Sequence, residues 1–477
     1  MTNAIVNNRA ISARRGAGAL AGRRYWPRRR TELCLLAVSW LVTIVAYMLV
    51  SLSTGSAALG GRGYIPAGIG GFLAVVIGLS LAAHLATRWL AREADPVILP
   101  VVALLNGLGW VMIARLDSIP SVAANNDHAH LALLQAAWTA IGVVLYIATL
   151  AVVRRGSDLG RYRYLMGLAG IALLVSPLLP VIGKNINGSR LWLYLGPLHI
   201  QPVELAKLAL VVFFASYLSE KRELLASPTK RVGNYLLPDP RPFGPLLVAF
   251  GFAILIIAAE NDIGFALIIF MVFLIMLWMA TGKALYVLIG FILFIGAAFI
   301  GIHLLPQASE RITVWLHPFA HAATTGYQLV QGEYALGSGG ITGAGLGLGQ
   351  PGLVPVVVTD MIFTAFGEEL GLIGTTALLV AFLVLVGAGL RIALRCRAEA
   401  SKLLAAGLTV VLGLQALIIV AGITRILPLT GVTLPFVAYG GSSLVANYIL
   451  VAILMRLSTE TKPPGGMSPL PGARRAH

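Results

Sequence analysis

Long apolar runs separated by short polar segments make up most of this chain. Runs of about 18 or more apolar residues recur along its whole length, and each is long enough to cross about 30 Å of hydrocarbon as a helix. The pattern therefore predicts about twelve transmembrane helices. Their expected ranges are 33–52, 65–86, 97–114, 131–152, 165–182, 203–219, 246–259, 263–281, 285–305, 361–390, 403–424 and 433–455. The segment 246–259 is short and meets Glu260, so eleven spans are the alternative.

Two polar segments between the predicted spans are longer than the rest. Segment 183–202 carries Trp192 and Tyr194, which are placed like the aromatic residues of a membrane surface. Segment 306–360 is rich in glycine and polar residues; a loop of that length is usually functional or disordered, and its content favours function. No internal repeat is evident, which disfavours a transporter built from inverted repeats.

Composition agrees with this pattern. Of 477 residues, 58% are hydrophobic and only 11% are charged, whereas about a quarter of the residues in soluble domains are charged. The predicted fold class is an all-α polytopic integral membrane protein with a large extracellular loop at 306–360. We expect a disordered basic arm at 1–32, one transmembrane domain at 33–456 and a disordered tail at 457–477. Both arm and tail are expected in the cytoplasm.

The distribution of basic residues predicts the topology. The net charge is +16, and basic residues gather in every second segment, for example at Arg154, Lys230 and Arg395. This is the positive-inside asymmetry. It predicts cytoplasmic termini and attraction to anionic membrane lipids, and it argues against nucleic acid as the partner that explains the charge. Cys34 and Cys396 both fall at cytoplasmic edges, so no disulfide framework is expected.

Ionisable residues at membrane depth require an explanation because they are costly there. Glu204 and Lys207 stand three positions apart at the start of a span, after Gln201. They predict either a local ion pair or part of a site.

A second acidic group lies near residue 360. Asp360 begins a predicted helix, where a carboxylate can cap free N–H groups without excluding a second role. Glu368 and Glu369 lie about two turns into the same helix and need a partner or a wet cavity. Arg190 and Arg425 are the expected cationic partners.

These groups all fall on the predicted outer side, so the sequence predicts a charge-lined cavity that opens outward. Its cations suit an anionic ligand such as a phosphate group: Arg190, Lys207, Arg311 and Arg425. Its carboxylates suit a divalent cation or general-base work: Glu333, Asp360, Glu368 and Glu369. No nucleotide-binding, zinc or nucleophile-elbow pattern is present, and no tightly bound cofactor is expected.

Four stretches of the chain resemble one family. They are Asn187 to Trp192 with Ile200 to Lys207; Glu260-Asn261-Asp262-Ile263-Gly264; Gly326-Tyr327-Gln328 through Gly339-Gly340 to Thr359-Asp360 and Gly367-Glu368-Glu369-Leu370-Gly371; and Leu429-Thr430-Gly431 through Pro435-Phe436 to Gly440-Gly441-Ser442-Ser443. In this order they resemble the shape, elongation, division and sporulation (SEDS) family of RodA/FtsW-type peptidoglycan polymerases. The two spans beyond the family's usual ten, with the basic arm, resemble actinobacterial members.

The resemblance implies a bacterial cytoplasmic membrane protein that polymerises lipid II into glycan strands on the outer face, in cell elongation, division or sporulation. It also implies a class B penicillin-binding protein as partner. The residues expected to be catalytic are His321, Glu333 and Asp360. Those expected to bind substrate are Arg190, Gln201, Glu204, Lys207, Arg311, Gln328, Glu368, Glu369 and Arg425.

The chain departs from the family pattern in one loop. Family members usually carry an Asp regarded as catalytic five positions before the Gly-Tyr-Gln motif, and this chain has His321 there. The stretch 315–322 contains no carboxylate. A histidine can accept a proton near neutral pH but cannot hold a metal as a carboxylate does. The missing carboxylate leaves open a scaffold of weakened activity that recruits the synthase. A lipid II flippase or other transporter that uses the same cavity is a further alternative.

Overall fold

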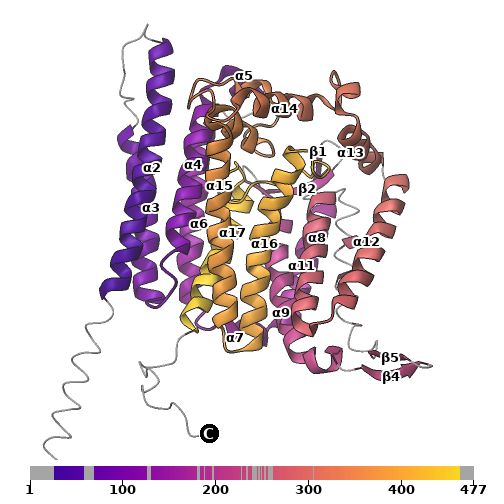
Figure 1. The fold of residues 1–477 in the computed structure, drawn as a ribbon. Helices are drawn as coiled ribbons and strands as arrows, with labels where there is room; N and C mark the ends of the chain where they lie inside the picture. The colour runs from indigo at the N-terminus through magenta and orange to yellow at the C-terminus, as the bar shows by residue number, and fades with distance from the viewer. Residues whose placement is uncertain are drawn as a thin grey trace, which may run out of the picture.

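The computed structural model shows a bundle of long helices whose two ends carry short helices and strands (Figure 1). It describes residues 26–58, 69–125, 130–179, 183–186, 189–195, 198–226, 228–232, 235–238, 244, 248, 250–251, 254–255, 262–304 and 306–461.

The long helices follow the predicted apolar runs. They are α2 (Trp26–Ala58), α3 (Ile69–Leu90), α4 (Ile98–Asp117), α6 (Leu131–Val152), α8 (Arg163–Val175), α9 (Val203–Ala226), α11 (Ile263–Thr281), α12 (Ala284–Leu304), α15 (Ile362–Arg395), α16 (Glu399–Ile423) and α17 (Gly441–Thr459). The short helices are α5 (Pro120–Asn125), α7 (Gly156–Arg161), α13 (Pro306–Leu316) and α14 (Tyr327–Gly339), with single 3₁₀ turns η2 (Ser176–Leu178), η4 (Pro318–His321) and η5 (Pro351–Leu353).

Length and composition qualify eight of the described helices as membrane-spanning: α2, α3, α4, α6, α11, α15, α16 and α17. Two further predicted spans, 165–182 and 285–305, correspond to shorter apolar helices within Arg163–Leu178 and Ala284–Phe299. The predicted span 203–219 lies within α9, whereas most of the predicted span 246–259 lies outside the described residues. A helical multi-pass membrane protein is therefore confirmed.

Two short sheets in the connecting segments were not predicted. In the first, β1 (Gly183–Ile186), β2 (Ser189–Leu195) and β3 (Leu198–Ile200) form an antiparallel sheet. A second hairpin joins β4 (Pro228–Val232) and β5 (Tyr235–Pro238). Both lie at bundle ends (Figure 1), and β2 contains Trp192 and Tyr194, aromatic residues that strands favour.

The segment 306–360 is largely helical rather than one irregular loop, since α13 and α14 lie within it. Helix α14 buries Leu329, Gly332 and Ala335, which recur at a spacing of three and so lie on one side of the helix. Helix α2 begins at Trp26, so the last residues of the predicted arm 1–32 are helical; residues 1–25 lie outside the described residues. Most of the predicted tail 457–477, from residue 462 onward, also lies outside the described residues.

Helices α9 and α11 are parallel neighbours. At one end the Lys207 ammonium nitrogen of α9 lies 5.7 Å from the centre of the Phe265 ring of α11. At the other end Arg222 Nε donates to the carbonyl of Ala280, at 3.1 Å. We call the end that carries α13, α14 and the sheet β1–β3 the α14 end, and the end that carries α7 and β4–β5 the α7 end (Figure 1). The N-terminal end of α2 and the C-terminal end of α17 both lie at the α7 end (Figure 1).

Candidate functional site

Glu204 and Lys207 form a fully buried pair in the first turn of α9. The predicted ion pair is confirmed, because Lys207 Nζ donates to a carboxylate oxygen of Glu204. The ammonium also donates to Gln415 Oε1 of α16 at 2.7 Å, and Gln415 Nε2 donates to the carbonyl of Thr433 at 3.0 Å. Buried charges are tolerated when they are paired and hydrogen-bonded in this way. The pair thus joins α9 to α16 and to the segment before α17.

Asp262 lies beside this pair at the start of α11. Its carboxylate caps the helix by accepting the N–H of Phe265 at 3.0 Å. The pKa of Asp262 is raised to about 6, mainly by burial; the charges of Glu204 and Asp360 contribute to the rise, and the Phe265 N–H and the Arg311 guanidinium oppose it. Four charged side chains therefore share one electrostatic environment at the α14 end.

Asp360 faces the segment before α17, which also contains Thr433. It does not cap a helix, although the sequence predicted that it would. Helix α15 begins at Ile362, and its N-cap residue is Met361, which makes no side-chain cap bond. A methyl group built on Gly431 would lie 3.6 Å from Asp360 Oδ2. Burial raises the pKa of Asp360, whereas the Thr359 hydroxyl and Arg311 lower it.

Arg311 of α13 completes this group. Its Nη1 donates to the carbonyl of Thr430 at 3.1 Å, within the segment that Asp360 faces. We call Asp262, Asp360, Arg311, Glu204 and Lys207 the inner group. It places carboxyl groups of raised pKa near a guanidinium, which suits proton transfer beside an anionic ligand.

Glu333 and Arg425 form a separate, partly exposed pair. Arg425 Nη1 lies 3.2 Å from Glu333 Oε1, and the Arg425 carbonyl accepts from Trp315 Nε1 at 3.0 Å. Arg425 was expected to pair with Glu368 or Glu369, so that prediction was wrong. Glu333 belongs to α14, the helix within the predicted loop 306–360, and this helix brings it next to Arg425 at the end of α16.

The other predicted residues are distributed around these groups. His321 ends η4 and is half-buried, and its carbonyl accepts the N–H groups of Thr324 and Gly326 at 2.9 and 3.0 Å. The Gln201 N–H donates to Ser442 Oγ at 2.9 Å. Gln328 lies in the first turn of α14 and is half-buried. Arg190 belongs to β2, but its side chain lies outside what the structure describes.

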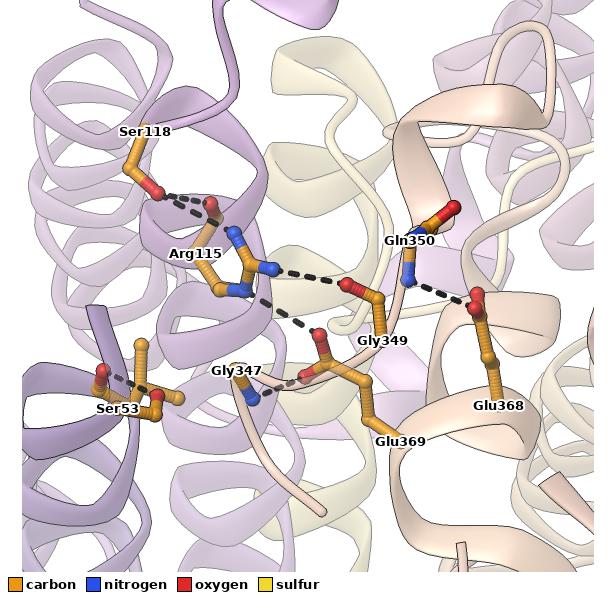
Figure 2. Close-up of polar contacts among 9 residues, drawn as sticks. Ser53, Arg115, Ser118, Gly347, Gly349, Gln350, Glu368 and Glu369 are labelled. Carbon is orange, nitrogen blue, oxygen red and sulfur yellow. Dashed lines mark hydrogen bonds and ion pairs between the residues drawn. The ribbon is translucent and has the colours of Figure 1, made fainter. Parts of the chain in front are cut away.

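Glu369 is paired with Arg115 of α4 rather than with a predicted arginine. Arg115 Nε donates to Glu369 Oε1 at 3.2 Å, and Arg115 Nη2 donates to the carbonyl of Gly349 at 3.1 Å (Figure 2). Glu369 Oε2 accepts the N–H of Gly347 at 2.8 Å. The glutamate is completely buried, so its carboxylate is satisfied by groups of the chain itself.

Glu368 and the backbone of α15 extend this arrangement. Glu368 Oε1 accepts the N–H of Gln350 at 2.7 Å (Figure 2). The carbonyls of Glu368 and Glu369 accept the N–H groups of Ala344 and Gly345, both at 2.9 Å. These carbonyls are free because α15 is broken at Gly371, whose φ of 64° and ψ of −164° end the regular hydrogen bonding. Residues 343–350, which we call the glycine segment, are therefore held on α15.

Among the described residues, no three His, Cys, Asp or Glu side chains gather as a metal ion would require. A divalent cation, which the sequence allows as one use of these carboxylates, stays an untested prediction.

Arg115 and Gln415 were not predicted as members of the candidate site, whereas Asp262 was expected on the outer side without an assigned role. Gln415 carried a usable signal, since it is a polar residue in the middle of an apolar run. Asp262 was expected on the outer side because it forms an acidic pair with Glu260 at a predicted helix break. Arg115 carried none that points to Glu369, which is 254 positions away.

Comparison with known proteins identifies the family. Residues 96–463 match the FtsW/RodA/SpoVE family, described as cell cycle protein. The chain belongs to this family. It is 40% identical to the peptidoglycan glycosyltransferase RodA of Mycobacterium tuberculosis over 438 residues, 92% of each chain. It is 33% identical to the stage V sporulation protein E of Bacillus subtilis over 375 residues, 77% of this chain and 98% of that protein.

Solved structures share the fold. The chain resembles, with a TM-score of 0.62 and 24% identity, a chain from a study of how a peptidoglycan synthase complex coordinates polymerization and crosslinking. That match covers 77% of this chain and 98% of the other. The rod shape determining protein RodA of Thermus thermophilus gives a TM-score of 0.55 at 23% identity, over 78% of this chain and 98% of that one. The FtsW/RodA/SpoVE family assignment and the RodA-like fold therefore agree.

Proposed function

We propose that this protein is a peptidoglycan glycosyltransferase that polymerises lipid II. The observation that carries the proposal is the 40% identity to a peptidoglycan glycosyltransferase over 92% of both chains. The inner group supports it because glycosyl transfer from a pyrophosphate needs a base and a cation, and Asp360 and Arg311 supply both.

The chemistry follows from these residues. A sugar hydroxyl of one lipid II forms a bond to the anomeric carbon of another chain, and the bond from that carbon to the pyrophosphate oxygen breaks. The hydroxyl proton passes to a carboxylate, for which we assign Asp360. The pyrophosphate leaves with the bonding electron pair, and Arg311 stabilises its charge. Lys207 is neutralised by Glu204, so we assign that pair to holding α9 and α16 in place.

We further propose twelve spans, with both termini in the cytoplasm and the α14 end outside the cell. The parallel pair α9 and α11 supports the twelfth span, because the chain must return to the α14 end between Ala226 and Asp262. The B. subtilis relative supports a ten-span core with two additional spans, since 98% of it covers only 77% of this chain. The α7 end carries Arg154 and Arg155, as an inner face does.

A class B penicillin-binding protein is the proposed partner. Its support is the similarity to a chain of a peptidoglycan synthase complex. Crosslinking requires a transpeptidase, and the described part of this chain offers none of the nucleophile patterns that such enzymes use.

Purified protein incubated with labelled lipid II tests the function. We expect glycan strands, with or without the partner synthase, and we expect the Asp360→Asn variant to lose most of them. A family member of known activity is the positive control. Absence of polymer in both conditions, beside an active control, would contradict the proposal.

A second candidate function is a scaffold that recruits the synthase without polymerising lipid II. The observation that favours it is the absence of a carboxylate in 315–322, where His321 stands. If the wild type is inert and His321→Asp creates polymerisation, the scaffold is supported. If the wild type polymerises lipid II, the scaffold proposal fails.

A further inference from the structure

The α2–α3 hairpin lies outside the residues that match the family, 96–463. It nevertheless reaches the glycine segment at the α14 end. Helix α2 runs along α4 and α3 runs along α6 at one edge of the bundle (Figure 1). Two independent contacts join the hairpin to the segment.

The first contact is a small apolar cluster that is separate from the main core. Tyr47 of α2 stacks on Phe72 of α3 with ring centres 4.0 Å apart, and Phe72 lies 4.8 Å from Trp110 of α4. Leu346 of the glycine segment is half-buried and packs against this cluster as well as against the main core. The buried members of the cluster are Ala46, Val50, Phe72, Trp110, Val111 and Ala136. Burial of these surfaces favours keeping Leu346 in place.

The second contact is the close approach of Ser53 to Gly347 (Figure 2). Gly347 has a φ of +81°, and a β-carbon there would lie 1.8 Å from Ser53 Oγ and 3.4 Å from the carbonyl oxygen of Val50. Only glycine fits against α2 in this conformation. The same residue donates its N–H to Glu369, so α2 and α15 contact the segment at one point.

We propose that the α2–α3 hairpin is a positioning element that clamps the glycine segment against Glu368 and Glu369. The segment has no regular structure of its own, so its order depends on what holds it on both sides. It leads along the chain to Asp360, which the proposed function makes the base. The expected effect on catalysis rests on the proposed function, whereas the contact between the hairpin and the glycine segment does not.

Hydrogen exchange of the full-length protein in nanodiscs tests the clamp. In Leu346→Ala we expect amides of 343–350 to exchange about tenfold faster or more, because truncating a packed leucine frees the segment. Leu348→Ala is the matched control, since Leu348 lies two residues away and is 66% exposed; it should exchange as the wild type does. Leu346→Met should restore most of the protection. Phe72→Ala loosens the clamp from the hairpin side and should reproduce the effect.

Unchanged exchange in both Leu346→Ala and Phe72→Ala would overturn the proposal. Lipid II polymerisation is the second measurement: kcat should fall at least fivefold in Leu346→Ala, with KM little changed, and stay unchanged in Leu348→Ala. Faster exchange with unchanged kcat would overturn the positioning role. If the wild type makes no glycan, the proposed function fails while the exchange result still decides the clamp.

Discussion

Asp262 makes the stability of the protein depend on pH. Its pKa rises from 3.8 to about 6 on folding, so the folded state binds more protons between these values. Its contribution to stability therefore falls as pH rises from about 4 to about 6, by about 3 kcal/mol at most.

Asp262→Asn should remove this dependence, because asparagine keeps an oxygen for the Phe265 N–H but does not ionise. We expect its thermal unfolding temperature to exceed that of the wild type by more at pH 7.5 than at pH 4.5, measured by tryptophan fluorescence. Glu310→Gln, at an exposed position of α13, is the control. An equal difference at both pH values would contradict the prediction.

Asp360 and Glu333 are competing candidates for the base. Asp360→Asn should lower the polymerisation rate by about 10²-fold or more, while Glu333→Gln should lower it much less. A general base acts in its deprotonated form, and burial raises the pKa of Asp360. On acidification, the wild-type rate should therefore begin to fall at a higher pH than it would if the base were an aspartate of ordinary pKa. The reverse order of the two variants would assign the base to Glu333.

At the scale of elements, the Arg115–Glu369 pair connects α4 to α15. Arg115→Met should destabilise the protein by about 3–5 kcal/mol, because it leaves a buried carboxylate without its cation. The double variant Arg115→Met/Glu369→Met should cost less than the sum of the two single variants. Thermal unfolding of the four proteins measures this coupling, and additive effects would show that the pair does not act as a unit.

Elements were predictable where the signal is local. Most spans follow from apolar runs because a membrane leaves helices few alternatives, and Glu204 and Lys207 follow from a spacing of three. The contacts that build the site are not local. Arg311 meets Thr430 and Arg115 meets Glu369 across more than a hundred positions, and nothing in either neighbourhood specifies the partner. Helix α14 was missed because glycine and polar residues hide its short apolar face.

At the scale of the whole molecule, the proposed topology places α14 outside the cell. In a Cys34→Ala background, Ser338→Cys should react with a membrane-impermeant maleimide on intact cells. Arg154→Cys should react only after permeabilisation. Cys396 should not react with the maleimide, because burial raises the pKa of its thiol to about 11 and the thiolate is the reactive form. Labelling in the opposite order would invert the topology.

The parallel arrangement of α9 and α11 also constrains how the protein is made. Both helices must enter the membrane in the same orientation, so the ribosome and the insertion machinery have to thread the chain back across between them. Deleting the part of the chain between Ala226 and Asp262 that makes this return would reverse the orientation of every helix synthesised afterwards. Helix α14 and the glycine segment would then emerge in the cytoplasm. The α2–α3 hairpin, inserted earlier, would still present the surface that contacts the glycine segment on the outer side of the membrane, so the two could not meet.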